Sequence, residues 1–152
     1  MKSNSPWKQF ALVGLVVLVG YFAVFNWVEY RRMVKGPWQI TFTQTNNSPA
    51  LVINQSTLGI TNVTILFANE TATTNLNQTV AFGQGRSVPF DLPFGKCVFL
   101  DPLFLPGTVA CQMFGHQIQI MPRALTIDES EHSWVSGETV VLTNKPAPQD
   151  QR

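Results

Sequence analysis

The sequence predicts an all-β domain, an antiparallel β-sandwich or barrel-like fold, that is preceded by a single N-terminal transmembrane α-helix. Three observations support this prediction. An apolar run of 19 residues without a charged side chain, Phe10 to Val28, stands near the start of the chain. Ten short segments with strand character follow, separated by Gly, Pro and Asn. The sequence after Val34 has no helical periodicity, and such a succession of strands and turns is typical of sandwiches and barrels.

The apolar run has the length of a membrane span. At 1.5 Å of rise per residue it covers roughly 28 Å, close to the hydrocarbon thickness of a bilayer. Trp7 before it, and Trp27 and Tyr30 at its far end, are residue types that settle at headgroup level as membrane-interface anchors. A cleaved signal peptide is the alternative, but its apolar run is usually about 7 to 15 residues, and no small-x-small cleavage site precedes FNWVEYRR. We therefore expect a retained signal-anchor.

The expected domains follow from these boundaries. They are a short polar leader over 1–9, the transmembrane helix over 10–28, a basic juxtamembrane segment over 29–37, the β-sandwich over 38–143 and a flexible tail over 144–152. Flanking positive charges do not decide the orientation, because both flanks carry nearly the same number. The low charge of the β-domain and its two cysteines favour a cytoplasmic N-terminus and a C-terminal domain that is periplasmic or extracellular.

Charged residues make up only 12% of the chain, about half of the usual share. Between Gly36 and Gly85 the only one is Glu70, although the apolar share of the whole chain, 45%, is normal. Asn, Gln, Thr and Ser therefore replace ions on the surface of this stretch. The net charge is +1 and no long basic run occurs outside the membrane flanks, which excludes the electrostatic pattern of a nucleic-acid-binding protein.

Strand candidates cover the chain from Trp38 to Thr143. The first, Trp38 to Thr45, alternates strictly, with Trp38, Ile40 and Phe42 on one face, and a turn from Asn46 to Pro49 follows. In the segment from Ile60 to Phe67, alternate apolar residues again share a face. The other candidates are 51–53, 79–82, 87–91, 96–100, 108–114, 116–121, 124–128 and 138–143.

Five Asn-x-Ser/Thr triplets recur at spacings of 8, 8, 7 and 8 residues and begin at Asn46, Asn54, Asn62, Asn69 and Asn77. In a eukaryotic secretory pathway these would be glycan acceptors. A strand plus a turn also takes about eight residues, and Asn and Thr favour turns and exposed strand faces. We favour this structural interpretation, and the sequence leaves glycosylation open.

Cys97 and Cys111 flank DPLFLPG, which predicts the tip of a hairpin. If residues whose numbers sum to 208 face each other, Phe99 meets Val109 and Cys97 meets Cys111. Directly opposed cysteines can be bridged, and closing a loop of this size would stabilise the domain by roughly 3 kcal/mol. A structural disulfide is the first interpretation, and two free buried cysteines are the second.

Cys111, His116 and Met121 form the pattern Cys-x4-His-x4-Met, and the surrounding FLPGTVACQMFGH resembles the metal-binding loop of cupredoxins. The resemblance covers about 18 residues and implies a copper or electron-transfer domain as an alternative function. The second, upstream imidazole of such a site is missing, because no histidine precedes His116. The alternation of HQIQIM would also point His116 and Met121 to opposite faces of a strand. The leading expectation is therefore a domain without a cofactor.

The acidic cluster DESEH, 128–132, lacks the spaced ligands of a calcium loop and is interpreted as a solvated turn. No nucleophile elbow or plausible triad accompanies His132, so we expect no enzyme activity.

The expected function is a non-catalytic protein-interaction, accessory or assembly subunit of a membrane complex, with the bilayer and other subunits as partners. Tyr21, Phe25 and Val28 form one stripe of the helix, beside Asn26, and are the expected partner face. The alternative, besides the copper domain, is a domain that binds carbohydrate or a cell-envelope polymer through Trp38, Trp134 and the amide-rich surface.

Overall fold

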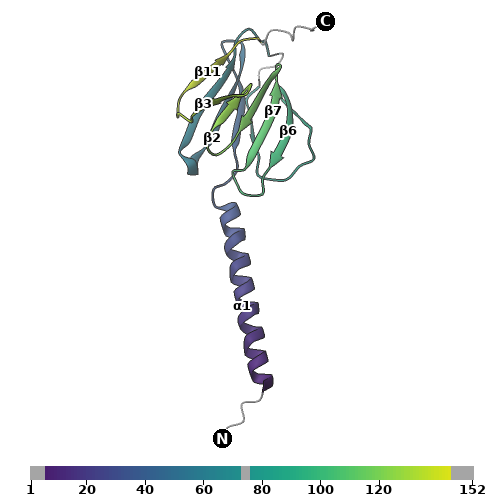
Figure 1. Ribbon diagram of the computed structural model, residues 1–152. Helices are drawn as coiled ribbons and strands as arrows, with labels where there is room; N and C mark the ends of the chain where they lie inside the picture. Colours follow the sequence, from purple (N-terminus) through teal and green to yellow (C-terminus); the bar gives the residue numbers. More distant parts are fainter. Residues whose placement is uncertain (1–5, 73–75, 145–152) are drawn as a thin grey trace. The chain divides into compact units, whose positions relative to one another are not determined.

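The computed structural model describes residues 6–72 and 76–144 (Figure 1). The chain divides into two compact units between Val34 and Lys35, an apolar helix and a β-rich domain. The expected all-β domain after an N-terminal apolar helix is therefore confirmed, with two sheets and a sandwich-like arrangement. The first five residues of the expected leader, and all of the expected tail after Asn144, lie outside the described residues.

Helix α1 (Pro6–Met33) has 28 residues, and none of them is buried. The mean hydropathy of its most apolar 18 residues is 2.2, and the helix is long and apolar enough to cross a membrane. The helix continues beyond the apolar run on both sides, so part of the expected leader and of the juxtamembrane segment is helical. At the C-terminal side an ion pair of 2.8 Å between Glu29 and Arg32 supports this extension. The helix ends before Gly36, whose φ of 67° belongs to the left-handed region.

The first sheet, called sheet A, has five strands in the order β11-β3-β2-β1-β4. Four of them come from one continuous stretch of the chain, and the fifth comes from the C-terminal side (Figure 1). They are β1 (Gln39–Thr45), β2 (Ser48–Gln55), β3 (Ile60–Phe67), β4 (Gln78–Ala81) and β11 (Thr139–Leu142), with a short 3-10 helix (Ser56–Leu58) between β2 and β3.

The second sheet, called sheet B, has six strands in the order β10-β9-β8-β7-β6-β5, so each strand pairs with its neighbour in sequence. They are β5 (Phe90–Leu92), β6 (Gly95–Asp101), β7 (Thr108–Met113), β8 (His116–Ile120), β9 (Leu125–Ile127) and β10 (Ser130–His132). The expected strand 87–91 begins later, at Phe90, which is consistent with Pro89 having no backbone N–H to donate to a ladder.

Two sequence predictions about the sheets are wrong. The sheets are not purely antiparallel, because β11 runs parallel to β3, with Thr139 opposite Thr64 and Leu142 opposite Phe67. The cluster DESEH is not simply a turn, because Ser130–His132 forms β10 and pairs with β9. Only Asp128 and Glu129, with φ of 47° and 70°, make the turn.

Asparagine carries much of the turn geometry in sheet A. Asn46 and Asn47 have φ of 54° and 67°, which forms the two-residue turn that matches the twist of a hairpin. Asn62 and Asn69 also have positive φ, and the Asn54 side chain accepts a hydrogen bond from the Asn62 backbone N–H at 2.8 Å. These roles support the structural interpretation of the repeated triplets, and glycosylation stays a prediction.

The core lies between the two sheets and takes the residues that the alternation predicts. Trp38, Ile40 and Phe42 of the first strand segment are 0% exposed, and Ile65 and Phe67 of β3 are buried on the same side. From sheet B the core receives one face of β7, β8 and β9, including Val109, Met113, Ile118, Ile120, Leu125 and Ile127. Outward residues of both sheets are mostly polar or half-buried, with Val141 and Phe99 as exposed apolar exceptions.

Candidate functional site

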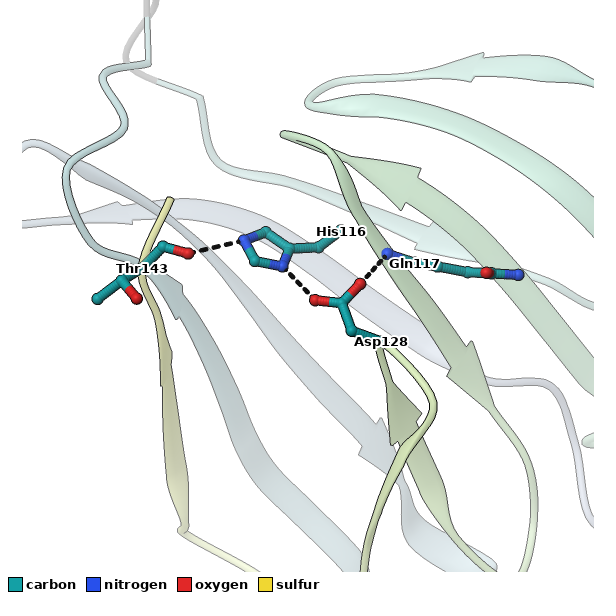
Figure 2. Close-up of polar contacts among 4 residues, drawn as sticks. All are labelled: His116, Gln117, Asp128 and Thr143. Atoms are coloured by element: carbon teal, nitrogen blue, oxygen red, sulfur yellow. Dashed lines mark hydrogen bonds and ion pairs between the residues drawn. The ribbon is translucent and has the colours of Figure 1, made fainter. Parts of the chain in front are cut away.

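A polar cluster around His116 lies where β8 begins and β11 ends (Figure 2). His116 is only 6% exposed. Its Nδ1 lies 2.5 Å from Oδ2 of Asp128, and its Nε2 lies 3.0 Å from the backbone oxygen of Thr143. The cluster therefore ties Thr143, which directly follows β11 of sheet A, to the first residue of β8, a central strand of sheet B.

The hairpin turn after β9 fixes the Asp128 carboxylate. Asp128 accepts a hydrogen bond from the Gln117 backbone N–H at 3.0 Å through its second oxygen, and its own N–H donates to the Gln117 carbonyl at 2.9 Å. Figure 2 shows the carboxylate between the His116 ring and the Gln117 backbone. These bonds fix the backbone N–H and one carboxylate oxygen of Asp128. The other oxygen is therefore held toward the imidazole.

Both ring nitrogens of His116 face an acceptor. A neutral imidazole carries a single N–H, so a neutral ring donates to one of these two acceptors at a time. Both ring nitrogens are engaged in this arrangement, and the contacts form a clamp between the two sheets.

The structure does not bring together the three residues of the cupredoxin-like pattern. Cys111 pairs with Ile118 and faces the core, whereas Met121 follows the end of β8 and is half-buried. His116 and Met121 are five residues apart along an extended segment, roughly 17 Å. Among the described residues, no group of three or more His, Cys, Asp or Glu side chains is arranged to hold a metal ion.

Cys97 and Cys111 lie directly opposite each other on β6 and β7, as the sequence predicts. The second predicted pair is wrong: Phe99 faces Ala110 instead of Val109, because the register shifts between Cys97 and Phe99. Both cysteines are free thiols in the structure and are buried. Hydrogen bonding with the Cys111 thiol lowers the pKa of Cys97 against the effect of burial, and the same contact together with burial raises the pKa of Cys111.

We expect mild oxidation of the purified chain to form a disulfide between Cys97 and Cys111, because the register places them at bridgeable positions. The free energy of unfolding should rise by about 3 kcal/mol. Intact mass would record the loss of two hydrogens, and urea titration of the β-domain would record the stabilisation. Cys97→Ser and Cys111→Ser are the matched controls and should not respond. Thiols that stay free, or form only intermolecular dimers, would contradict the bridge.

The two tryptophans proposed for a carbohydrate surface pack against each other instead. Trp38 is 0% exposed, and its ring stacks on Trp134 with centroids 5.3 Å apart. The Trp38 indole N–H donates to the Gly107 carbonyl at 3.0 Å, and the half-buried Trp134 donates to the Met121 carbonyl at 2.9 Å. Trp38 therefore cannot belong to an exposed aromatic surface, and Trp134 is only partly accessible.

The expected partner face of α1 contains a stacked aromatic pair. Tyr21 and Phe25 lie 6.2 Å apart between ring centroids, and both are more than half exposed. Val28 on the same stripe is 37% exposed. Asn26 donates from its side chain to the Phe22 carbonyl at 2.9 Å, so a contact with another helix would use its second hydrogen or its oxygen.

The expected interface anchors lie near the two ends of α1. Trp7 is the second residue of the helix, and Trp27 and Tyr30 belong to its last two turns. All three side chains are more than half exposed, and the Arg31 guanidinium lies 4.8 Å from the centre of the Trp27 ring. Aromatic and basic residues are thus paired at the C-terminal end of the helix, as at a headgroup layer.

Sheet A has an outer face without charge. Its five strands, all within the described ranges, contain no Asp, Glu, Lys, Arg or His, whereas the strands of sheet B contain Asp91, Lys96, Asp101 and Glu131. The register aligns one outward row across the whole sheet: Thr79, Thr41, Val52, Thr64 and Thr139. The low charge of 36–85 is visible in the sequence, whereas the place of β11 beside β3 is not.

Comparison of the chain with protein-family models, with curated proteins and with solved structures found no match.

Proposed function

We propose that this chain is a single-pass membrane protein whose β-domain lies outside the cytoplasm and acts as a non-catalytic docking subunit of a membrane complex. The observation that carries the proposal is the uncharged outer face of sheet A, five strands wide. The partner that this face suits is another protein subunit with a similarly uncharged surface.

The chemistry of this face favours contact with protein over contact with water. Surfaces that stay solvated usually carry charged side chains at about a quarter to a third of their positions. Burying a charge in an interface costs free energy unless it is paired, and the cores of protein interfaces are depleted in charged residues. The row that contains Thr41, Val52 and Thr64 has short, uncharged side chains. A partner that covers this row therefore buries no unpaired charge.

Helix α1 supports the membrane location and a second interface. Its exposed side chains are apolar over a length that suits a bilayer, and helices in lipid associate through packing and hydrogen bonds. The aromatic pair Tyr21 and Phe25 provides the packing surface, and Asn26 the polar group. Contacts of this kind are individually weak, so the helix would add to the contact made by sheet A.

The orientation is tested on intact cells. Protease added outside cells or spheroplasts should digest the β-domain after Lys35, because a domain with few charges and two cysteines suits an exported compartment. Immunoblots with an N-terminal tag follow the fragment. A domain that is digested only after lysis would reverse the proposed orientation and leave the anchor itself in place.

The docking face is tested by substitution and by crosslinking. Thr64→Lys introduces a charge at the middle of sheet A and should strongly reduce co-purification of partner subunits in mild detergent. A photocrosslinking residue at position 64 should label a protein, and so should one at Phe25.

Matched positions provide the controls for this test. Gln119 is also half-buried and outward, at the middle of sheet B, and Gln119→Lys should leave co-purification unchanged. Val19 and Ala23, which lie on the opposite face of α1 from Phe25, should label lipid only. Equal labelling at all positions, together with a monomer in mild detergent, would refute the docking function.

A further inference from the structure

The loop between β6 and β7 exposes two large apolar side chains. Leu103 is 52% exposed and Phe104 is 59% exposed. The loop has a fixed shape, because the Leu103 N–H donates to the Asp101 carboxylate at 3.0 Å. Gly107 closes it with φ of 73°, and a Cβ there would lie 2.0 Å from the Asp101 carbonyl oxygen. Leu103 and Phe104 are thus held outward by the fold.

This loop lies at the end of the β-domain where the chain enters from α1. The Trp38 indole donates to the Gly107 carbonyl at 3.0 Å, which joins the base of the loop to the first core residue of the domain. Trp38 follows the last helical residue, Met33, by five positions, and an extended chain of that length spans at most roughly 17 Å.

The connecting residues are themselves bound to the β-domain. Gln55 donates from its side chain to the carbonyls of Lys35 and Gly36 at 2.7 and 2.8 Å. The Thr57 hydroxyl also donates to the Lys35 carbonyl, at 2.5 Å. Because 35–37 are held in this way, the free connection between the helix and the domain is even shorter than the number of residues indicates.

The charges around this end do not oppose a lipid surface. Lys35 stands at the entry point, and Arg86 follows Phe82, whose N–H donates to the Trp38 carbonyl at 3.0 Å. Asp101 is the acidic residue at the base of the loop. Basic residues together with exposed Leu and Phe are the composition of segments that lie in the headgroup layer, and Lys35 and Arg86 supply the positive charges.

We infer that Leu103 and Phe104 enter the boundary between headgroups and acyl chains of the same bilayer that holds α1. This inference rests on the membrane anchor of the proposed function. The bilayer is the favoured occupant because a short, bound connection keeps this end of the domain near the surface where the helix emerges. The contact gives the β-domain a second point of attachment and limits its rotation about the connection.

The test places one fluorescent probe at a time on the full chain in phosphatidylcholine vesicles that contain a nitroxide-labelled acyl chain. The probe, an environment-sensitive dye, is attached to Leu18→Cys, Leu103→Cys or Val141→Cys. Cys97 and Cys111 are buried, so the unsubstituted chain serves as the labelling blank. Val141 is the matched control: it is 56% exposed but pairs with Leu66, toward the opposite end of sheet A from Trp38.

Probes at 18 and 103 should lose most of their fluorescence to the nitroxide, and the probe at 141 should keep it. Adding Phe104→Ser should reduce the quenching at 103 without altering that at 18. Loss of quenching at 18 would remove the anchor of the proposed function. Quenching at 18 without quenching at 103 would overturn this inference alone, and so would equal quenching at 103 and 141. A protein crosslink from 103 in cells, without quenching in vesicles, would assign the loop to a partner subunit instead.

Discussion

Replacing Trp38 by alanine should lower the free energy of unfolding of the β-domain by about 4 kcal/mol, the range for removing a large buried aromatic residue. Trp38 is 0% exposed and stacks on Trp134 with ring centroids 5.3 Å apart. The substitution leaves a cavity at the end of the core. It also removes the hydrogen bond to the Gly107 carbonyl, so the β6–β7 loop loses a fixed point.

Urea titration in detergent, followed by circular dichroism of the sheets, measures the change. Trp38→Phe is the matched control, since it keeps an aromatic ring against Trp134 but cannot donate to Gly107. We expect it to cost roughly 1 to 2 kcal/mol, for one hydrogen bond and a smaller ring. Equal and small effects of both substitutions would show that Trp38 does not organise this end of the core.

Alternation in the sequence was sufficient to place most of the strands. Trp38, Ile40 and Phe42 are buried on one face, and the same period places Ile65 and Phe67. All ten expected segments overlap observed strands. Strand positions were predictable because apolar and polar residues alternate in any strand with one buried face, whichever strands it pairs with.

Pairing between distant strands was not predictable in the same way. β11 joins sheet A beside β3, about 75 residues earlier in the chain, and nothing in TVVL specifies that neighbour or its parallel direction. β10 was missed because its three residues include Glu131 and His132, and a short edge strand can be as polar as a turn. The register shift between Cys97 and Phe99 likewise depends on packing, and the spacing of the residues in the sequence does not indicate it.

The polar cluster around His116 was not predictable from the sequence either, because it depends on which strands pair. In the sequence, His116 belongs only to the alternative cupredoxin-like pattern, and Asp128 belongs to the segment interpreted as a solvated turn. Their contact arises because β9 folds back on β8 and brings Asp128 beside Gln117. The acceptor at Thr143, directly after β11 of sheet A, is a backbone oxygen, which no side-chain pattern can indicate. A predicted hairpin pairing between β8 and β9 would have been the useful signal.

We expect His116→Ala to lower the free energy of unfolding by about 3 kcal/mol, because the substitution takes a hydrogen-bonding partner from both a carboxylate and a partly buried carbonyl. The loss should be greatest where sheet A and sheet B are joined. Backbone amide hydrogen exchange should therefore accelerate at Ala68, whose N–H donates to the Leu142 carbonyl at 2.8 Å, just before Thr143.

Gln117→Ala is the control on the same strand. Gln117 contacts Asp128 only through its backbone N–H in the cluster, and its side chain is exposed, so its truncation should cost less than about 0.5 kcal/mol. A double-mutant cycle that combines His116→Ala with Asp128→Asn then measures how far the His116 contact depends on the Asp128 carboxylate, since the amide keeps an oxygen for the Gln117 N–H. If His116→Ala and Gln117→Ala have equal effects, the clamp does not join the sheets, and the stability of sheet A must depend on its apolar core alone.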